Sequence, residues 1–187
     1  HLADRDRDRR QETVGGKGLD FHYTEKLPLL DKPWDAVVLQ SYSTLDENNP
    51  GDPKLLTEYT RKFDATLHAR NPNVKIYLNA TWSRADLIYP ADAPWSGKPI
   101  TQMALDIAAG YEAARKASPG IAGIAPVGQA WNRAFATGVA DPNPYDGISA
   151  GQVNLWAEDA YHASDFGYYL EALVIFGKVT GLDPLSL

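Results

Sequence analysis

The feature that most constrains this fold is a regular alternation of short apolar runs with longer amphipathic segments. Three runs rich in Val, Ile, Leu and Ala have the length of buried strands: 35–40, 74–79 and 121–127. Apolar residues recur every three or four positions in the remaining segments, which predicts helices over 53–71, 100–117, 128–137 and 164–181. Because parallel strands need a crossover between them, this alternation predicts an α/β fold with helices on both faces of a parallel sheet.

Length and composition narrow the classes of function. The 187 residues fit a charged lead-in over 1–10 and a single α/β domain over 11–187. With 18 Lys and Arg against 24 Asp and Glu, the net charge of −6 argues against a nucleic-acid partner. No apolar run approaches the length of a membrane span. The absence of Cys excludes thiolate chemistry and leaves the compartment undetermined, a secreted or periplasmic location included.

Asp159 and His162 stand three residues apart, directly before the helix that Ser164 is expected to cap. A turn can place the carboxylate against one imidazole nitrogen and leave the other nitrogen free to act as a general base. The alternative is that Asp159 caps the turn and His162 is simply exposed. His22 and His68 have no acidic partner at a useful spacing. One Asp and one His are too few ligands for a metal, and no Gly-rich phosphate loop follows a strand, so no cofactor is expected.

The pattern Asp-x-x-His-x-Ser-x-x-Gly-x-Tyr-Leu over 159–170 resembles the last sequence block of the SGNH (GDSL-like) esterase/hydrolase superfamily. Residues 13–17 look like its second block, and 35–41 lie where its third block begins. The resemblance implies a three-layer, flavodoxin-like sheet and assigns Asp159 to orient His162. It also implies that the Gly16 backbone and the Gln40 amide are the oxyanion donors. The family has Asn where this sequence has Gln40, so the alternative is that Gln40 only bonds a loop carbonyl.

The family's first block, a strand ending in Gly-Asp-Ser or Gly-Asn-Ser, has no counterpart in this sequence. Ser41 and Ser43 follow a strand, but they stand at the oxyanion block. The family's strand order 2-1-3-4-5 places the first strand inside the sheet, and its loss would leave neighbouring strand edges unpaired. The sequence begins with His1 and has its only Met at 103. We therefore expect an upstream piece, a separate chain or a partner to supply both that strand and the nucleophilic Ser.

The prediction of a substrate depends on residues that follow the strands. Four such residues are candidates for substrate contact: Trp82, Arg84, Trp131 and Asn132. Loop Trp rings can stack on sugars, although they more often cover a core. The expected function is a Ser-dependent esterase acting on a small-molecule or carbohydrate acyl ester. The rival interpretation is a non-catalytic carbohydrate-binding or assembly protein on the same scaffold.

Overall fold

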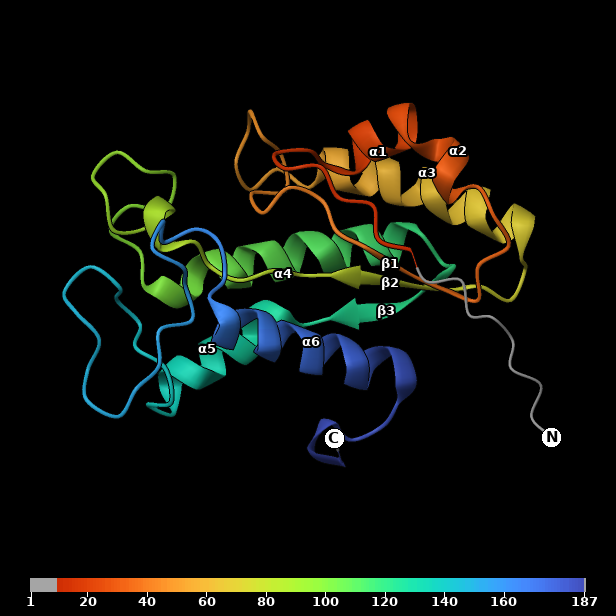
Figure 1. The fold of residues 1–187 in the computed structure, drawn as a ribbon. Helices are drawn as coiled ribbons and strands as arrows, with labels where there is room; N and C mark the ends of the chain where they lie inside the picture. Colours follow the sequence, from red (N-terminus) through yellow and green to blue (C-terminus); the bar gives the residue numbers. More distant parts are fainter. Residues whose placement is uncertain (1–9, 187) are drawn as a thin grey trace.

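A three-stranded parallel sheet forms the centre of the computed structural model, which describes residues 10–186 (Figure 1). Its strands lie in the order β1 (Ala36–Leu39), β2 (Lys75–Asn79) and β3 (Ile121–Ala125). All three were predicted, each one or two residues longer than observed. The α/β class is therefore confirmed, while residues 1–9 of the lead-in predicted over 1–10 lie outside the described residues.

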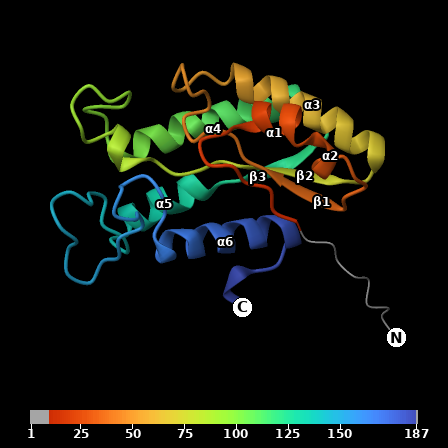
Figure 2. The same cartoon turned by 45° about the horizontal axis from the view of Figure 1, so that its top comes forward.

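Helices cover both faces of the sheet (Figures 1 and 2). One face carries α3 (Lys54–Arg70) and α4 (Ile100–Ala117), with the short α1 (Leu19–Glu25) and α2 (Leu27–Leu30) beside α3. The other face carries α5 (Val127–Ala136) and α6 (Asp165–Thr180). The four long helices match their predicted segments to within a residue at each end. No helix among residues 10–186 is long and apolar enough to cross a bilayer.

The main core lies between the sheet and the α3–α4 layer. Phe63 of α3 and Ile107 of α4 are almost completely buried there, against Ile76 and Leu78 of β2. These are the apolar positions that recur every three or four residues in the helices and alternate in the strand. Their removal from water is the main contribution to the stability of this layer. Because the three strands are parallel, their carboxyl ends lie at one edge of the sheet.

A second core lies under the loops at that edge. It is built from Trp82, Trp131 and Trp156 together with small residues, and Leu170 and Val174 of α6 pack against it. The Trp82 and Trp131 rings are stacked, with centroids 4.8 Å apart and planes 6° apart. This aromatic core is what holds the long loops of the molecule in place.

The chain differs from prediction before β1 and in the loop after β2. Before β1 the structure has the helices α1 and α2, which were not predicted. Helices of seven and four residues are too short to show a periodic apolar pattern. The long loop over 81–99 contains one turn of 3-10 helix, η1 (Ala85–Leu87), and a second such turn, η2 (Pro184–Ser186), follows α6.

β1 lies at the edge of the sheet and pairs only with β2 among the described residues. Its side chains are unusually accessible for a strand of an α/β sheet: Val38 is 38% exposed and Ala36 is also exposed. An apolar edge strand with free backbone groups is a surface to which another strand can add. The additional strand expected from the sequence stays a prediction, and this edge is where it would pair.

Candidate active site

Asp159 and His162 form a hydrogen-bonded pair at the carboxyl edge of the sheet. Asp159 Oδ2 lies 2.5 Å from His162 Nδ1. The other carboxylate oxygen, Oδ1, accepts the backbone N–H groups of Tyr161 at 3.1 Å and His162 at 2.9 Å. The carboxylate thus caps the turn with one oxygen and binds the imidazole with the other, so both interpretations drawn from the sequence apply at once.

This arrangement defines the charge of Asp159 and the tautomer that a neutral His162 adopts. The hydrogen bond from His162 lowers the pKa of Asp159 to about 2, with further contributions from the two backbone N–H groups. An ionised carboxylate at Nδ1 keeps the proton on that nitrogen and leaves Nε2 as the basic one. The His162 and Asp159 side chains are 57% and 50% exposed, so the pair is open to a substrate.

The pair sits on a tight turn that closes like a hairpin. Ala157 N–H donates to the His162 carbonyl at 2.8 Å, and Ser164 N–H donates to the Leu155 carbonyl at 2.8 Å. Ala160, in the middle of the turn, has a φ of 56°, a conformation that costs a residue with a Cβ about 1 kcal/mol or more. The predicted cap of α6 is present, since Ser164 Oγ accepts from Gly167 N.

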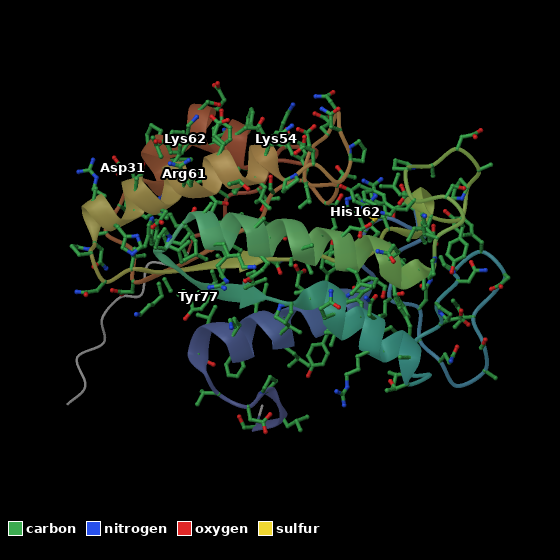
Figure 3. The ribbon with its side chains drawn as sticks, turned by 180° about the vertical axis from the view of Figure 1, so that it is seen from behind. Asp31, Lys54, Arg61, Lys62, Tyr77 and His162 are labelled. Atoms are coloured by element: carbon green, nitrogen blue, oxygen red, sulfur yellow. The ribbon has the colours of Figure 1, made fainter. Side chains whose placement is uncertain are left out.

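Contacts from the loop after β2 fix this turn in place. The Trp82 indole N–H donates to the Tyr161 carbonyl at 3.1 Å, and Asp86 N–H donates to the Ala160 carbonyl at 3.3 Å. Figure 3 shows His162 at the end of the molecule where these loops gather, opposite the end that carries Asp31. The His turn is therefore a docked element with its own backbone partners.

Arg84 completes the docking by stacking on Tyr161. Its guanidinium carbon lies 3.6 Å from the centre of the Tyr161 ring, and the Tyr161 and His162 ring centres are 4.2 Å apart. The guanidinium is held by Asp86 through two hydrogen bonds of 3.0 and 2.6 Å, and by Ser43 Oγ at 3.3 Å. Arg84 is thus near His162 as expected, with its charge already balanced by a neighbouring carboxylate.

The other residues expected to contact substrate are placed differently. Trp131 is fully buried and Trp82 is 7% exposed, so these rings offer little or no surface to a ligand. Asn132 donates from Nδ2 to the Thr101 carbonyl at the start of α4. Trp82 contacts the His turn through its indole N–H, and Trp131 is covered by the second core, so we do not include Trp131 in the site. Substrate binding by Asn132 stays a prediction.

Gln40 follows β1 and is exposed at the same edge of the sheet. Its Oε1 accepts a hydrogen bond of 2.7 Å from Asn79 Nδ2. Its Nε2 makes no hydrogen bond to a described residue, so an amide donor is left available. This differs from the alternative drawn from the sequence, in which Gln40 would bond a loop carbonyl.

In the Gly-rich segment before α1, it is Gly18 rather than Gly16 that packs close to the end of β1. Gly16 is in an exposed turn with φ of 69°, and nothing lies within 4 Å of where its Cβ would stand. Gly18 is buried, and a Cβ there would be 2.3 Å from the Tyr42 ring. The role of Gly16 therefore stays a prediction, whereas Gly18 is the glycine whose lack of a side chain the packing requires.

No serine hydroxyl among residues 10–186 hydrogen-bonds His162 Nε2. The Ser41 hydroxyl is buried and accepts from Leu19 N–H at 3.4 Å. The Ser43 hydroxyl accepts from Arg84, and the Ser83 hydroxyl accepts from Ala104 N–H at 2.9 Å. Each of these three hydroxyls thus accepts a hydrogen bond from a group outside the Asp159–His162 pair, and the Ser164 hydroxyl, nearest in sequence, donates to the Asn154 carbonyl at 2.7 Å.

A second Asp–His pair contradicts one expectation. His68 Nδ1 lies 2.8 Å from Asp64 Oδ1, so the prediction that His68 has no acidic partner was wrong. Residues four apart on a helix lie one above the other, and this spacing should have been recognised. The pair lies on α3, away from the His162 turn, and is useful as a control.

Comparison with known proteins supports the fold. No family model matches this chain, and no curated protein matches it. A protein described as "a putative SGNH hydrolase" from Slackia heliotrinireducens is 22% identical, with a TM-score of 0.61 over 88% of this chain and 80% of its own. A DUF4886 family protein from Bacteroides uniformis ATCC 8492 is 19% identical, with a TM-score of 0.63 over 85% of this chain. This chain spans 55% of that second protein's length. The chain has an SGNH-like fold.

Proposed function

We propose that this protein is a serine hydrolase of the SGNH type that cleaves an acyl ester, such as that of an acetylated carbohydrate. One observation carries the proposal: Asp159 binds Nδ1 of an exposed His162 at 2.5 Å and is itself held by two backbone N–H groups. This is the arrangement that prepares an imidazole to accept a proton at Nε2. The SGNH-like fold adds to it, because the pair lies at the carboxyl edge of a parallel sheet, where ligands bind in such folds.

In this mechanism a Ser hydroxyl attacks the ester carbonyl while His162 Nε2 takes its proton. His162 then returns the proton to the leaving alcohol, and a water repeats the two steps on the acyl-enzyme. Asp159 stabilises the imidazolium that forms in each half-reaction. Gln40 Nε2, with Gly16 N–H as the second donor predicted from the sequence, would bind the developing oxyanion. One such donor contributes about 3 kcal/mol of transition-state stabilisation.

The Ser would come from a strand outside the described residues that adds to β1. Two features favour this source: the hydroxyls of Ser41, Ser43 and Ser83 hydrogen-bond groups other than His162, and β1 has no partner on its outer edge among residues 10–186. A strand in that position would end at the same edge as Gln40, because parallel strands share one carboxyl edge. An upstream segment and a separate chain fit this role equally well.

A fluorophosphonate probe on the full-length protein tests the proposal, because it labels a Ser activated by a base. We expect rapid labelling of the wild type and of His68→Ala, and slow labelling of His162→Ala. Mass spectrometry of the labelled peptide then locates the Ser. A wild type that neither labels nor hydrolyses p-nitrophenyl acetate faster than His162→Ala would instead support the non-catalytic binding protein.

A further inference from the structure

Glu171 is a partly buried carboxylate that the proposed mechanism does not use. It lies on α6 and faces the sheet, where its Oε1 accepts a hydrogen bond of 2.6 Å from Asn79 Nδ2. Burial raises the pKa of Glu171 above its ordinary value, and the hydrogen bond from Asn79 partly opposes that increase. Burying a carboxylate costs free energy unless hydrogen bonds compensate for the lost water. The partly buried position of Glu171 therefore needs an explanation.

Asn79 connects this carboxylate to Gln40. The Asn79 side chain is at the end of β2 and is 2% exposed. Its Nδ2 has two hydrogens, and both are used: one is donated to Glu171 Oε1 at 2.6 Å and the other to Gln40 Oε1 at 2.7 Å. Three side chains from α6, β2 and the segment after β1 thus form one chain of hydrogen bonds.

The chemistry of Glu171 determines which groups donate and which accept along these hydrogen bonds. An ionised carboxylate can only accept, so Glu171 requires the NH₂ end of the Asn79 amide to face it. The second hydrogen of that NH₂ group then requires an acceptor from Gln40, which selects Oε1. If the Gln40 amide were turned over, Nε2 would face Nδ2 and two donors would oppose each other. Glu171 therefore determines, through Asn79, which end of the Gln40 amide points outward.

Contacts of Tyr168 connect the turn of α6 that carries Glu171 to the turn that carries Asp159 and His162. Tyr168 lies one turn before Glu171 on α6, and its ring meets the Trp82 ring edge-on at 6.1 Å. Burial raises the pKa of Tyr168, and the negative charges of Glu171 and Asp159 raise it further. Trp82 in turn donates its indole N–H to the carbonyl of Tyr161, the residue before His162, at 3.1 Å.

We propose that Glu171 and Asn79 are positioning residues that hold the Gln40 amide with its N–H groups, rather than its carbonyl, directed at the oxyanion. The proposal rests on the function proposed above, since it assigns a purpose to the orientation of Gln40 in that reaction. A pre-oriented donor is more effective than a free one because it needs no reorganisation as the charge develops.

Side-chain amide signals in the ¹⁵N-labelled full-length protein test the hydrogen-bond chain without any need for activity. We expect Glu171→Gln to shift the Gln40 and Asn79 amide signals, because a neutral amide no longer imposes one orientation on Asn79. The matched control, Glu112→Gln, changes an exposed carboxylate of α4 and should leave both signals in place. Gln40 signals that are unaffected by Glu171→Gln would overturn the positioning role.

A double-mutant cycle on p-nitrophenyl acetate hydrolysis tests the functional part. We expect Gln40→Ala to lower kcat about 10²-fold or more, and Glu171→Gln to lower it about tenfold with KM changed less than threefold. The double variant should be no slower than Gln40→Ala alone, because Glu171 acts only through Gln40. Losses that multiply would overturn the proposal.

Asn79→Asp gives an independent check, because it replaces the NH₂ donor of Asn79 by a carboxyl group. The new carboxyl group faces Glu171, and the two groups would share one proton between them, so neither offers a donor to Gln40 Oε1. The Gln40 amide should then turn over and donate Nε2 inward, with a loss of kcat similar to that of Gln40→Ala. An unchanged kcat in a folded Asn79→Asp protein would contradict the positioning role. A wild type without hydrolase activity would refute the proposed function, whereas the amide signals would still decide whether the chain orients Gln40.

Discussion

The Arg84 guanidinium lies on one side of the docked His turn, with its carbon 3.6 Å from the centre of the Tyr161 ring. Because Tyr161 in turn lies 4.2 Å from His162, the stack links an ion pair of the loop after β2 to the proposed general base. A cation over an aromatic face is attracted to the ring quadrupole. We therefore expect Arg84 to help place His162, which does not require contact with the substrate.

We expect Arg84→Ala to lower kcat about tenfold, because small displacements of a catalytic group cost one to two orders of magnitude in rate. Labelling by the fluorophosphonate probe should slow by a similar factor. The matched control is Arg70→Ala, which removes the ion pair with Asp31, of 2.5 Å, at the opposite end of the molecule (Figure 3). Equal effects of the two substitutions would show that Arg84 acts only through general stability.

Asp159→Asn should lower kcat by a factor of about 10³ to 10⁴, because the amide can no longer hold the Nδ1–H tautomer and stabilise the imidazolium. Its Oδ1 can still accept the Tyr161 and His162 backbone N–H groups, so the turn and the thermal unfolding temperature should change little. Asp64→Asn makes the same chemical change in the Asp–His pair of α3 and should leave kcat intact. A fully active Asp159→Asn variant would remove Asp159 from the mechanism.

The pKa of Asp159 is about 2, below its ordinary value of 3.8, and the largest cause is the hydrogen bond from His162. A carboxylate whose pKa is lowered by folding adds stability above about pH 4 and loses that contribution as the pH falls toward 2. A ¹³C NMR titration should show this low midpoint in the wild type and a higher one in His162→Ala. Asp141, whose pKa is lowered by backbone N–H groups of Asn143 and Ser149, should titrate alike in both proteins. An Asp159 midpoint that His162→Ala does not change would contradict the pairing.

Gly167→Ala should destabilise the protein by about 1–3 kcal/mol, because an added Cβ would lie 2.3 Å from the Leu155 carbonyl and 2.6 Å from the Trp131 ring. Leu155 belongs to the segment that closes the His turn, so activity should fall together with the unfolding temperature. Gly15→Ala serves as the control, since nothing lies within 4 Å of its added Cβ. Chemical denaturation measures both effects, and equal stability of the two variants would contradict this account of the packing.

The alternating strands and helices were predictable because each depends on a local pattern. Strand β2, helix α4 and the Ser164 cap follow from apolar periodicity and from residue types within one segment. The Asp159–His162 contact was predictable for the same reason, since three residues of chain and one turn bring the two side chains together. The sequence determined those features because the interacting groups are close along the chain.

Only the tertiary structure decided what surrounds that pair. Asn79 and Glu171 are 92 residues apart, and no local pattern relates a residue at the end of β2 to one on α6. Trp82 and Trp131, expected near substrate from their place in loops, are buried because the loops fold back over them as a second core. The packing of the helices across the sheet decides which polar and aromatic residues meet at the sheet edge. That packing depends on the burial of the whole apolar surface rather than on the chemistry of any one segment.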